Sequence, residues 1–329
     1  DHVLGNAEKL QASSYRALGD QRVMVGDIMG QRTTPALTLP TPGAGARTRA
    51  HVQVQTGCDH RCTFCVIPFG RGNARSVPPE EVVGQIAALA DAQVPEVVLT
   101  GVDLTSWGGD LPGKPALGEL VGRILTLVPH LKRLRLSSLD VIELDPQLFA
   151  HITTNPRVQP YLHLSLQHGH DLILKRMKRR HSVADAMDLM ACLRAARPEI
   201  AFGADIIAGF PTETEEHAAA TRAFVAAAGI AFLHVFPYSP RAETPAARMP
   251  QLPRDVIKAR AAALRAVGAD LLARHLDTHV GRTVDALVER PGSARLDDFT
   301  PVALTGGRAG ERRTLRISGH EGTRLLAGA

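Results

Sequence analysis

The sequence predicts an α/β fold: a partial barrel of six strand-and-helix units, followed by a small all-β module. Six short β-rich runs recur along the chain, and amphipathic helical patterns lie between them. Near Thr278 the pattern changes to short strands that glycines interrupt. Strands that alternate with helices form a parallel sheet covered by helices, and six such units suggest an open barrel. A chain of 329 residues is long enough to bury a core of that size.

The predicted barrel strands are short runs rich in β-branched and apolar residues. They lie at residues 51–55, 97–101, 133–138, 161–167, 202–210 and 232–238. Residues 78–93 and 213–229 exemplify the helical stretches between them, and Thr212 with Glu215 is spaced like a capping box for the second. A long helix at 252–281 ends the barrel. The all-β module then has predicted strands at 283–290, 300–306, 313–319 and 323–328.

Composition divides the chain into three parts. Residues 27–50 mix proline, glycine, threonine and alanine without an apolar period, which is typical of a linker or a poorly ordered arm. We therefore expect an N-terminal segment with its linker at 1–50, the barrel at 51–277 and the all-β module at 278–329.

Composition also excludes some classes of protein. The sequence has no run of eighteen apolar residues and does not begin with the basic and apolar blocks of a secretory signal, so we expect a cytoplasmic protein without a membrane partner. Lysine and arginine number 38 against 33 acidic residues, a surplus of five. This is weak evidence for a polyanionic partner, because a genome that favours arginine codons gives the same balance.

The cysteines indicate a metal or cluster site. Three of the four, Cys58, Cys62 and Cys65, lie within eight residues, which excludes a disulfide framework spread along the chain. The fourth, Cys192, lies in the middle of a predicted helix, where we expect it to be a buried core residue.

The cysteine group follows the first predicted strand directly, so its loop opens at the carboxyl end of the sheet. Three thiolates hold a four-iron cluster and leave one iron free to bind a chelating substrate or cofactor. Two alternatives remain open on this spacing. One is a tetrahedral zinc site in which His60 or a more distant histidine is the fourth ligand. The other is one face of a helix with no ligand at all.

The Cys-x-x-x-Cys-x-x-Cys spacing after a first strand, with Phe64 just before the last cysteine, resembles the signature of the radical S-adenosylmethionine (SAM) superfamily. The resemblance implies that the open iron of a [4Fe-4S] cluster binds the amino and carboxylate groups of SAM. An electron from the cluster then cleaves SAM to a 5'-deoxyadenosyl radical, while the protein positions and shields the reactants.

Further stretches resemble the methylthiotransferases of that superfamily, over nearly all of the chain. CVIPFGRGNARS continues the cysteine loop, and LTGVDLTSWGGD, RLRLSSLD, LHLSLQHGHD, ADIIAGFPTETEE and HVFPYSPRAETP follow at the ends of successive predicted strands. The resemblance implies SAM contacts at Phe64, Thr100, Gly101, Ser137, Ser138, Gln167, Asp205, Gly209 and Phe236. Taken singly, each of these residues also fits a helix cap, a turn or a strand end.

Within that family the sequence motifs are most similar to those of the branch that acts on N6-threonylcarbamoyladenosine at position 37 of tRNA, beside the anticodon. The resemblance implies attachment of a methylthio group to carbon 2 of the base, with SAM used as both methyl donor and radical source. The alternatives are N6-isopentenyladenosine in tRNA and an aspartate of a ribosomal protein. The alternative from another class is a zinc-stabilised RNA-binding protein without catalysis.

RNA contacts are expected at two places. The tail resembles the small TRAM-like RNA-binding module of these enzymes, and residues 174–181, LKRMKRRH, are the densest basic run. The candidates for contact with the tRNA anticodon stem-loop are Arg71, Arg75, Lys178, Arg179, Arg180, Arg241, Arg312 and Arg313. A solvated helix end or β surface would look similar. The resemblance also implies a reductase of the flavodoxin or ferredoxin type as electron donor, and we expect a monomer.

The chain departs from the family pattern at several places. Full-length members carry an N-terminal domain whose three further cysteines bind a second, auxiliary [4Fe-4S] cluster. Residues 2–10 resemble only the end of that domain, so we expect a truncated chain that cleaves SAM without inserting sulfur. His168 stands where the family usually has serine, and Thr212 and Glu243 stand where it usually has glycine.

Overall fold

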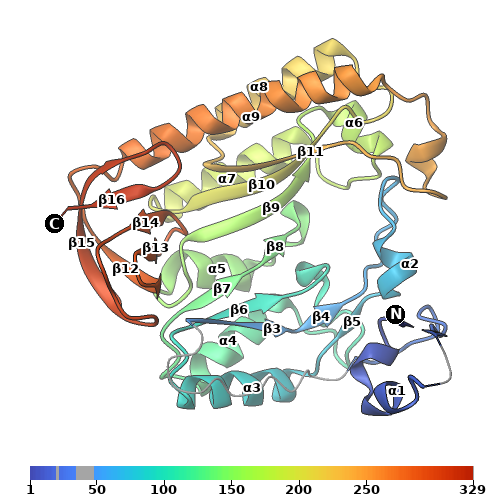
Figure 1. The fold of residues 1–329 in the computed structure, drawn as a ribbon, viewed down its shortest axis with the longest axis horizontal. Coiled ribbons are helices and arrows are strands. Elements are labelled where there is room, and N and C mark those ends of the chain that lie inside the picture. Colours follow the sequence, from blue (N-terminus) through green and yellow to red (C-terminus); the bar gives the residue numbers. More distant parts are fainter. Residues whose placement is uncertain (20–21, 35–47, 329) are drawn as a thin grey trace.

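The computed structural model describes residues 1–19, 22–34 and 48–328, so residues 35–47 of the predicted linker lie outside the described part. The centre of the molecule is a curved parallel sheet (Figure 1). Its strands are β3 (Arg49–Gln53), β6 (Glu96–Thr100), β7 (Leu134–Leu136), β8 (Ser138–Leu139), β9 (Tyr161–Gln167), β10 (Ala201–Ala208) and β11 (Phe232–Pro237). They pair in parallel as β3-β6-β7 and β8-β9-β10-β11, and Ser137 separates β7 from β8. The predicted six-unit partial barrel is confirmed.

Helices cover the outer face of this sheet. They are α3 (Pro79–Asp91), α4 (Leu117–Leu127), α5 (Pro146–Thr154), α7 (Val183–Ala196), α8 (Glu215–Ala228) and α9 (Arg254–Asp277). Figure 1 shows the strands between α3 and α4 on one side and α7, α8 and α9 on the other. Short elements at the strand ends complete the barrel: α2 (Ile67–Arg71), β4 (Gln55–Thr56), β5 (Arg75–Ser76), η2 (Leu104–Ser106), η3 (Val141–Glu143), α6 (Asp171–Arg176) and η4 (Pro245–Arg248).

Alternation along the strands gives the barrel a dry outer face and a polar inner face. Leu162, Leu164 and Leu166 of β9 are fully buried in the main core beneath the helices. Side chains of a strand alternate between its two faces, so His163 and Ser165 of the same strand point into the barrel. Each buried leucine contributes about 1.5–3 kcal/mol of hydrophobic stabilisation. The apolar side chains on the outer face therefore stabilise the sheet, and the polar side chains on its inner face are available for binding or catalysis.

The expected capping box before α8 is wrong by two residues. The box is formed by Thr214 and His217: Thr214 Oγ1 accepts the His217 N–H at 3.3 Å, and His217 Nδ1 accepts the Thr214 N–H at 3.1 Å. A capping residue must stand immediately before the first helical turn. Thr212 instead lies in a turn, with φ +68°.

The expected burial of Cys192 is also wrong, because this residue is exposed on α7. The buried side chains of this helix are Ala186, Met190 and Leu193. Successive helical residues are about 100° apart, which turns position 192 away from that face.

The C-terminal part is a closed five-stranded barrel. Its strands are β12 (Thr283–Arg290), β13 (Ser293–Leu296), β14 (Pro301–Ala303), β15 (Arg312–His320) and β16 (Leu325–Ala327), in the order β12-β13-β14-β16-β15. Its own small core contains Val288, Leu296 and Ile317. Sequence reasoning missed β13, a four-residue strand that pairs with its chain neighbours β12 and β14.

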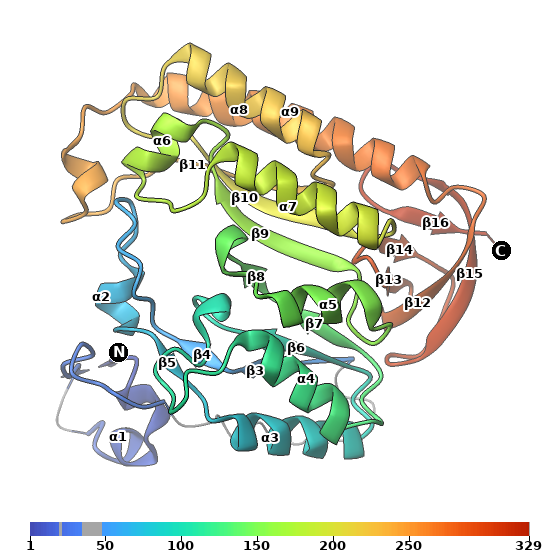
Figure 2. The ribbon, with the colours of Figure 1, turned by 180° about the vertical axis from the view of Figure 1, so that it is seen from behind.

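This five-stranded barrel packs against the amino ends of the parallel strands. Glu289 Oε1 of β12 accepts a hydrogen bond from Arg49 Nη1 at 3.0 Å, and Arg135 Nη1 donates to the backbone oxygen of Asp297 at 2.8 Å. Figures 1 and 2 both show it at the opposite end of the strands from α2.

The first residues form short elements beside α2: β1 (Val3–Leu4), η1 (Glu8–Leu10), α1 (Ala12–Arg16) and β2 (Val23–Met24). Strands β1 and β2 pair in parallel as a separate two-stranded sheet. Among the residues that the structure describes, no helix combines the length and apolarity needed to cross a membrane.

Candidate functional site

The cysteine loop leaves the sheet through a turn that requires glycine. Strands β4 and β5 pair antiparallel at the base of the loop. Gly57 follows with φ +73°, and a Cβ atom there would lie 1.9 Å from the backbone oxygen of Asn73. The Cys58 N–H then donates to the Gly72 backbone oxygen at 3.1 Å. The turn therefore places the loop over the carboxyl ends of the strands, as the sequence predicts.

The three cysteines share one cavity of about 150 Å³ at that end of the barrel. All three are partly buried free thiols. The lining is Cys58, His60, Cys62, Phe64, Cys65, Ile67, Val102, Asp103, Ser138, Asp140, Ser165, Gln167 and Arg179. The Ile67 N–H donates to Cys65 Sγ at 3.4 Å, and Arg179 Nη1 lies 3.8 Å from Cys62 Sγ. The loop thus meets β8, β9 and the segment after α6 around a single space.

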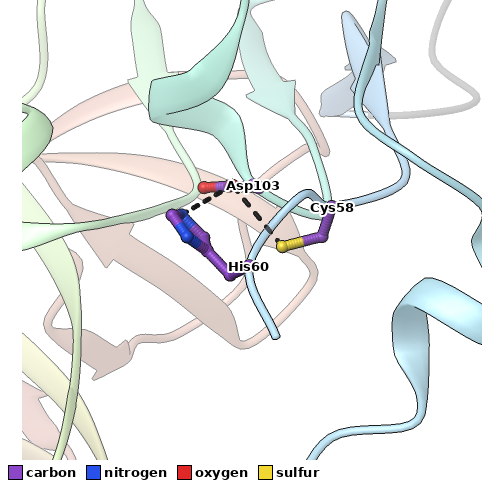
Figure 3. A group of neighbouring side chains, drawn as sticks. All are labelled: Cys58, His60 and Asp103. Atoms are coloured by element: carbon purple, nitrogen blue, oxygen red, sulfur yellow. Dashed lines mark hydrogen bonds and ion pairs between the residues drawn. The ribbon is translucent and has the colours of Figure 1, made fainter. Parts of the chain in front are cut away.

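Asp103 lies between His60 and Cys58, as Figure 3 shows. Its Oδ2 atom is 3.0 Å from His60 Nε2 and 3.5 Å from Cys58 Sγ, and it accepts the Ser106 hydroxyl at 2.6 Å. Gln55 Oε1 accepts the Asp103 backbone N–H at 2.9 Å. Asp103 lies in the loop after β6 and contacts the first cysteine.

Charges around Asp103 set the protonation of its neighbours. Burial alone would raise the pKa of Asp103, but hydrogen bonds from His60 and Ser106 outweigh it and lower that pKa. Hydrogen bonds to Asp103 and Glu143 raise the pKa of His60 to about 10. The pair is therefore an ion pair at neutral pH, and Asp103 holds His60 and Cys58 on the same carboxylate oxygen.

The cysteines are better suited to bind a metal or cluster than to react as free thiolates. Burial, followed by the nearby Asp103 carboxylate, raises the pKa of Cys58 to about 12, and burial raises the pKa of Cys65. Such thiols lose their protons when a metal binds the sulfur. Arg179 Nε is buried without a hydrogen-bond partner among the described residues. Three sulfur donors with a cation beside them match an iron–sulfur cluster, which carries negative charge on its thiolates.

Three of the predicted SAM contacts line the cysteine cavity: Phe64, Ser138 and Gln167. Ser137 lies next to it, and its Oγ atom is buried with no hydrogen-bond partner among the described residues. Orphaned buried polar atoms are rare in folded proteins and mark places where a ligand supplies the partner.

Thr100 and Gly101 lie at the end of β6, outside that lining. The Thr100 hydroxyl donates to the Val52 backbone oxygen at 3.2 Å. A Cβ atom on Gly101 would lie 2.9 Å from Gln55 Oε1, so this glycine makes room for the side chain that holds Asp103.

The remaining three SAM candidates do not line the cysteine cavity. Asp205 lies in the middle of β10 and not at the strand end, where the sequence had suggested it; its Oδ1 atom is 3.0 Å from His163 Nε2 and 3.3 Å from His234 Nδ1. Gly209 turns the chain after β10 with φ +74°. Phe236 is half exposed on β11.

Two of the predicted RNA contacts are wrong, because their side chains are buried. Arg179 is held by Asp140 Oδ2 at 2.6 Å and by the Ser165 backbone oxygen at 2.8 Å, beside the cysteines. Arg75 donates to the Arg71 backbone oxygen at 2.9 Å and stabilises the turn after α2. A guanidinium without exposed surface has no access to a phosphate.

The other RNA candidates keep exposed surface but do not form one patch. Lys178 and Arg241 are exposed, and Arg71 is partly exposed near the cysteine loop. Arg180 pairs with Glu143 and lies 3.0 Å from His60 Nε2. Arg312 and Arg313 are on β15, at the opposite end of the molecule.

Sequence reasoning missed Asp103, Asp140 and Ser165 as cavity residues. Asp103 had a signal, an acid just after a strand end and a glycine. Asp140 and Ser165 had none, because their roles depend on Arg179, which is distant from Ser165 and Asp140 along the chain.

Comparison with known proteins gives consistent results. The Radical SAM superfamily model matches residues 52–225. The threonylcarbamoyladenosine tRNA methylthiotransferase MtaB of Rickettsia prowazekii is 49% identical over 304 residues, which cover 92% of this chain and 72% of that protein. MtaB of Bacillus subtilis is 34% identical over 76% of this chain and 53% of its own length. The tRNA-2-methylthio-N(6)-dimethylallyladenosine synthase of Maricaulis maris is 38% identical over 74% of this chain and 55% of its own.

Among solved structures, the chain is similar to the radical SAM methyltransferase TsrM from Kitasatospora setae, solved with cobalamin and a [4Fe-4S] cluster bound. The TM-score is 0.50 at 18% identity, over 62% of this chain and 39% of that one. This likeness concerns the fold alone.

Proposed function

Because the chain belongs to the radical SAM superfamily and, within it, to the tRNA methylthiotransferase family, we propose that it carries the radical chemistry that attaches a methylthio group to carbon 2 of N6-threonylcarbamoyladenosine 37 in tRNA. The observation that carries the proposal is the cavity where three cysteines meet at the carboxyl ends of the parallel strands. The 49% identity to a threonylcarbamoyladenosine tRNA methylthiotransferase supports the substrate.

The two cofactors of the superfamily are a [4Fe-4S] cluster and SAM. Cys58, Cys62 and Cys65 would hold the cluster and leave one iron open for SAM. The bound cluster supplies the electron that cleaves SAM to a carbon radical. The match over residues 52–225 includes the cysteine loop, so the zinc-stabilised, non-catalytic alternative is not retained.

The chain's own residues position and shield these groups. Asp103 holds Cys58 and His60 in place, and Arg179, anchored by Asp140, sets a fixed cation beside Cys62. Phe64, Ser138 and Gln167 are proposed SAM contacts because they share the cavity with the cysteines. Ser137 is a proposed contact because its buried hydroxyl lacks a hydrogen-bond partner among the described residues. Thr100, Gly101, Asp205, Gly209 and Phe236 remain proposed contacts that only the family resemblance supports.

We further propose that residues 278–329 are a TRAM-like RNA-binding domain and that residues 51–277 are the radical SAM domain. Arginines on β15, with Arg312 and Arg313 partly exposed, support contact with phosphates. This barrel lies at the amino ends of the parallel strands and the cysteines at their carboxyl ends. An RNA that contacts both must span the barrel, along a path comparable to the roughly 36 Å length of the 24-residue helix α9.

The target base must leave its stack to reach the cysteine cavity, and an adenosine in a loop does so at a lower free-energy cost than one in a duplex. This favours a tRNA anticodon loop as substrate. We also propose a cytoplasmic monomer that receives electrons from a reductase of the flavodoxin or ferredoxin type.

A second candidate substrate is N6-dimethylallyladenosine in tRNA. It is motivated by the Maricaulis maris synthase, which is 38% identical over 250 residues. Both substrates have the same reaction at carbon 2 and differ in the group on N6. A modification of a ribosomal protein has no such observation in its favour here.

The first test is anaerobic reconstitution of the chain with iron and sulfide. We expect about four irons per chain and reductant-dependent formation of 5'-deoxyadenosine from SAM. Cys62→Ser should lose both, whereas Cys192→Ser, a matched change at an exposed cysteine, should keep both. Iron binding that survives Cys62→Ser would overturn the cluster assignment.

The second test addresses the substrate with the complete gene product, because this chain spans 72% of its Rickettsia relative. It is incubated with tRNA that carries either threonylcarbamoyladenosine or dimethylallyladenosine, and the nucleosides are analysed by mass spectrometry. A methylthio mass shift on the first supports the proposal. A shift on the second alone would transfer the assignment to the other substrate.

A further inference from the structure

A second cluster of metal-ligating side chains lies where α9 meets the five-stranded barrel. His275 is in the last turn of α9, His279 follows four residues later, and Asp298 lies in the loop between β13 and β14. One ligand atom from each of the three lies within 4.8 Å of the others. The group is at the end of the molecule away from the cysteines, so the radical chemistry does not account for it.

The three ligand atoms lie close together, but the nitrogens of His279 make no well-aligned hydrogen bond in the described part of the chain. Asp298 Oδ2 is 2.9 Å from His279 Nε2 and 3.4 Å from His275 Nε2. Both ring nitrogens of His279 are nevertheless buried without a hydrogen bond of acceptable geometry among the described residues. Ligands at about 2.0 Å from a tetrahedral metal ion lie about 3.3 Å apart. The two separations are close to that value.

Asp298 differs from the other acids around it. Asp285 pairs with Arg312 at 3.2 Å, and Glu199 pairs with Arg197 at 2.8 Å. Asp297 pairs with Arg133. The ion-pair partners of Asp298 are the two imidazoles instead. A buried carboxylate needs a compensating cation.

The carboxylate of Asp298 is also held by a residue of its own loop. The Thr300 backbone N–H donates to Asp298 Oδ1 at 3.0 Å, which fixes the carboxylate with Oδ2 toward the imidazoles. The Thr300 hydroxyl lies 2.8 Å from His275 Nε2, so this nitrogen must give up that contact to bind a metal.

An ion has access to this group from a neighbouring cavity. A cavity of about 580 Å³ lies at the junction and is lined by all three residues. It leaves room for a water molecule as a fourth ligand, which is the usual completion of a three-residue zinc site.

We propose that His275, His279 and Asp298 bind one divalent transition-metal ion of the zinc class, which fixes the five-stranded barrel to α9. Two imidazole nitrogens and one carboxylate oxygen are a ligand set that zinc accepts in proteins. The ion joins two segments that are otherwise held by side-chain contacts, and so sets the position of the proposed RNA-binding domain relative to the radical SAM domain.

The test uses the chain with its iron–sulfur cluster already reconstituted, so that iron occupies the cysteines. The protein is exposed to Zn²⁺, passed over a desalting column with a weak chelator, and analysed for both elements. We expect about one zinc per chain beside about four irons. His279→Gln and Asp298→Asn should lose the zinc and keep the iron. His320→Gln, whose imidazole pairs with Asp277 near the same junction, should keep both.

Thermal unfolding supplies a second readout that does not depend on retention through a column. Added Zn²⁺ should raise the Tm of the wild type and of His320→Gln, but not that of His279→Gln. The proposal would be overturned if the wild type retains no zinc and its Tm does not rise with added Zn²⁺. The three side chains would then only contact one another across the junction. Zinc retained equally by His279→Gln would also overturn the proposal.

Discussion

Phe299 of the five-stranded barrel stacks on Tyr161 at the start of β9, with ring centroids 4.8 Å apart and planes 22° from parallel. The guanidinium groups of Arg135 and Arg295 lie 5.0 Å and 4.2 Å from the centroid of the same Phe299 ring. One side chain of the loop after β13 thus occupies the amino end of the parallel sheet and joins the two barrels.

Replacement of this ring should loosen the junction. An aromatic pair contributes about 0.5–1.5 kcal/mol, and partly desolvated cation–π contacts add a similar amount. Phe299→Ala should therefore lower the free energy of local opening of β12 and β15 by about 2 kcal/mol, measured by amide hydrogen exchange. Phe69→Ala, at an exposed phenylalanine, serves as the control and should change nothing. Unchanged protection in Phe299→Ala would show that other contacts hold the junction.

Much of the barrel could be predicted because its signals are local. The runs at 161–167 and 202–210 alternate or cluster apolar residues within a few positions, and they became β9 and β10 nearly as expected. The cysteine loop is equally local, since its three thiols lie within eight residues and follow a strand.

The rest depends on contacts between distant parts of the chain. Arg179 was placed on an RNA surface because its neighbours are basic, yet the side chain is drawn inward by Asp140, 39 positions away. Cys192 was expected to be buried because a lone cysteine in a helix behaves as a small apolar residue, yet it lies off the face that Ala186, Met190 and Leu193 bury. Asp298 gave no signal in the sequence, since the histidines it meets are on another element.

A buried acid at the amino end of β6 makes stability depend on pH. Burial alone would raise the pKa of Glu96, but Arg135, Arg49 and Arg133 outweigh it and lower that pKa to about 2. Because the folded-state pKa lies below the unfolded value near 4.3, this stabilisation is complete above about pH 4.3 and lost as the pH falls toward 2. The loss is on the order of 3 kcal/mol.

Glu96→Gln tests this directly through urea unfolding between pH 7 and pH 3. The variant should be less stable at pH 7 by roughly 3–5 kcal/mol, because buried arginines lose their counter-charge, and its stability should vary less with acid. Glu80→Gln, at an exposed pair with Arg123, is the control. If the free energy of unfolding of Glu96→Gln falls with acid as steeply as that of the wild type, other carboxyl groups cause the fall.

Glu243 occupies a backbone conformation that favours glycine, with φ +67°. The family usually has glycine at this place, and the exposed side chain has no packing to lose. Glu243→Gly should raise the free energy of unfolding by about 1 kcal/mol. The same substitution at Glu216, in the first turn of α8, should lower it by up to about 1 kcal/mol. Two changes of equal sign in chemical denaturation would contradict the argument from backbone conformation.

Inside the barrel, Asp205 controls the charge of a neighbouring histidine. A hydrogen bond to Asp205 raises the pKa of His234 above its ordinary value. In Asp205→Asn that pKa should return toward about 6.5, as followed by NMR titration of the imidazole. The stabilisation from this pair is present below pH 6.5 and is lost as the pH rises through the folded-state pKa of His234. An unshifted titration in the variant would assign the raised pKa to another group.

The buried Arg179 and the partly exposed Arg312 should separate catalysis from RNA binding. Arg179 Nη1 lies 3.8 Å from Cys62 Sγ, so Arg179→Met should reduce SAM cleavage by about tenfold or more and leave tRNA affinity unchanged. Arg312→Ala should leave SAM cleavage unchanged and reduce the slope of log K against log salt for tRNA by about one, because one phosphate contact is lost. Both are measured on the reconstituted protein, by 5'-deoxyadenosine formation and by tRNA binding at several salt concentrations. If Arg179→Met binds tRNA more weakly but cleaves SAM at the full rate, Arg179 contacts RNA. The proposed role of its charge beside Cys62 would then be wrong.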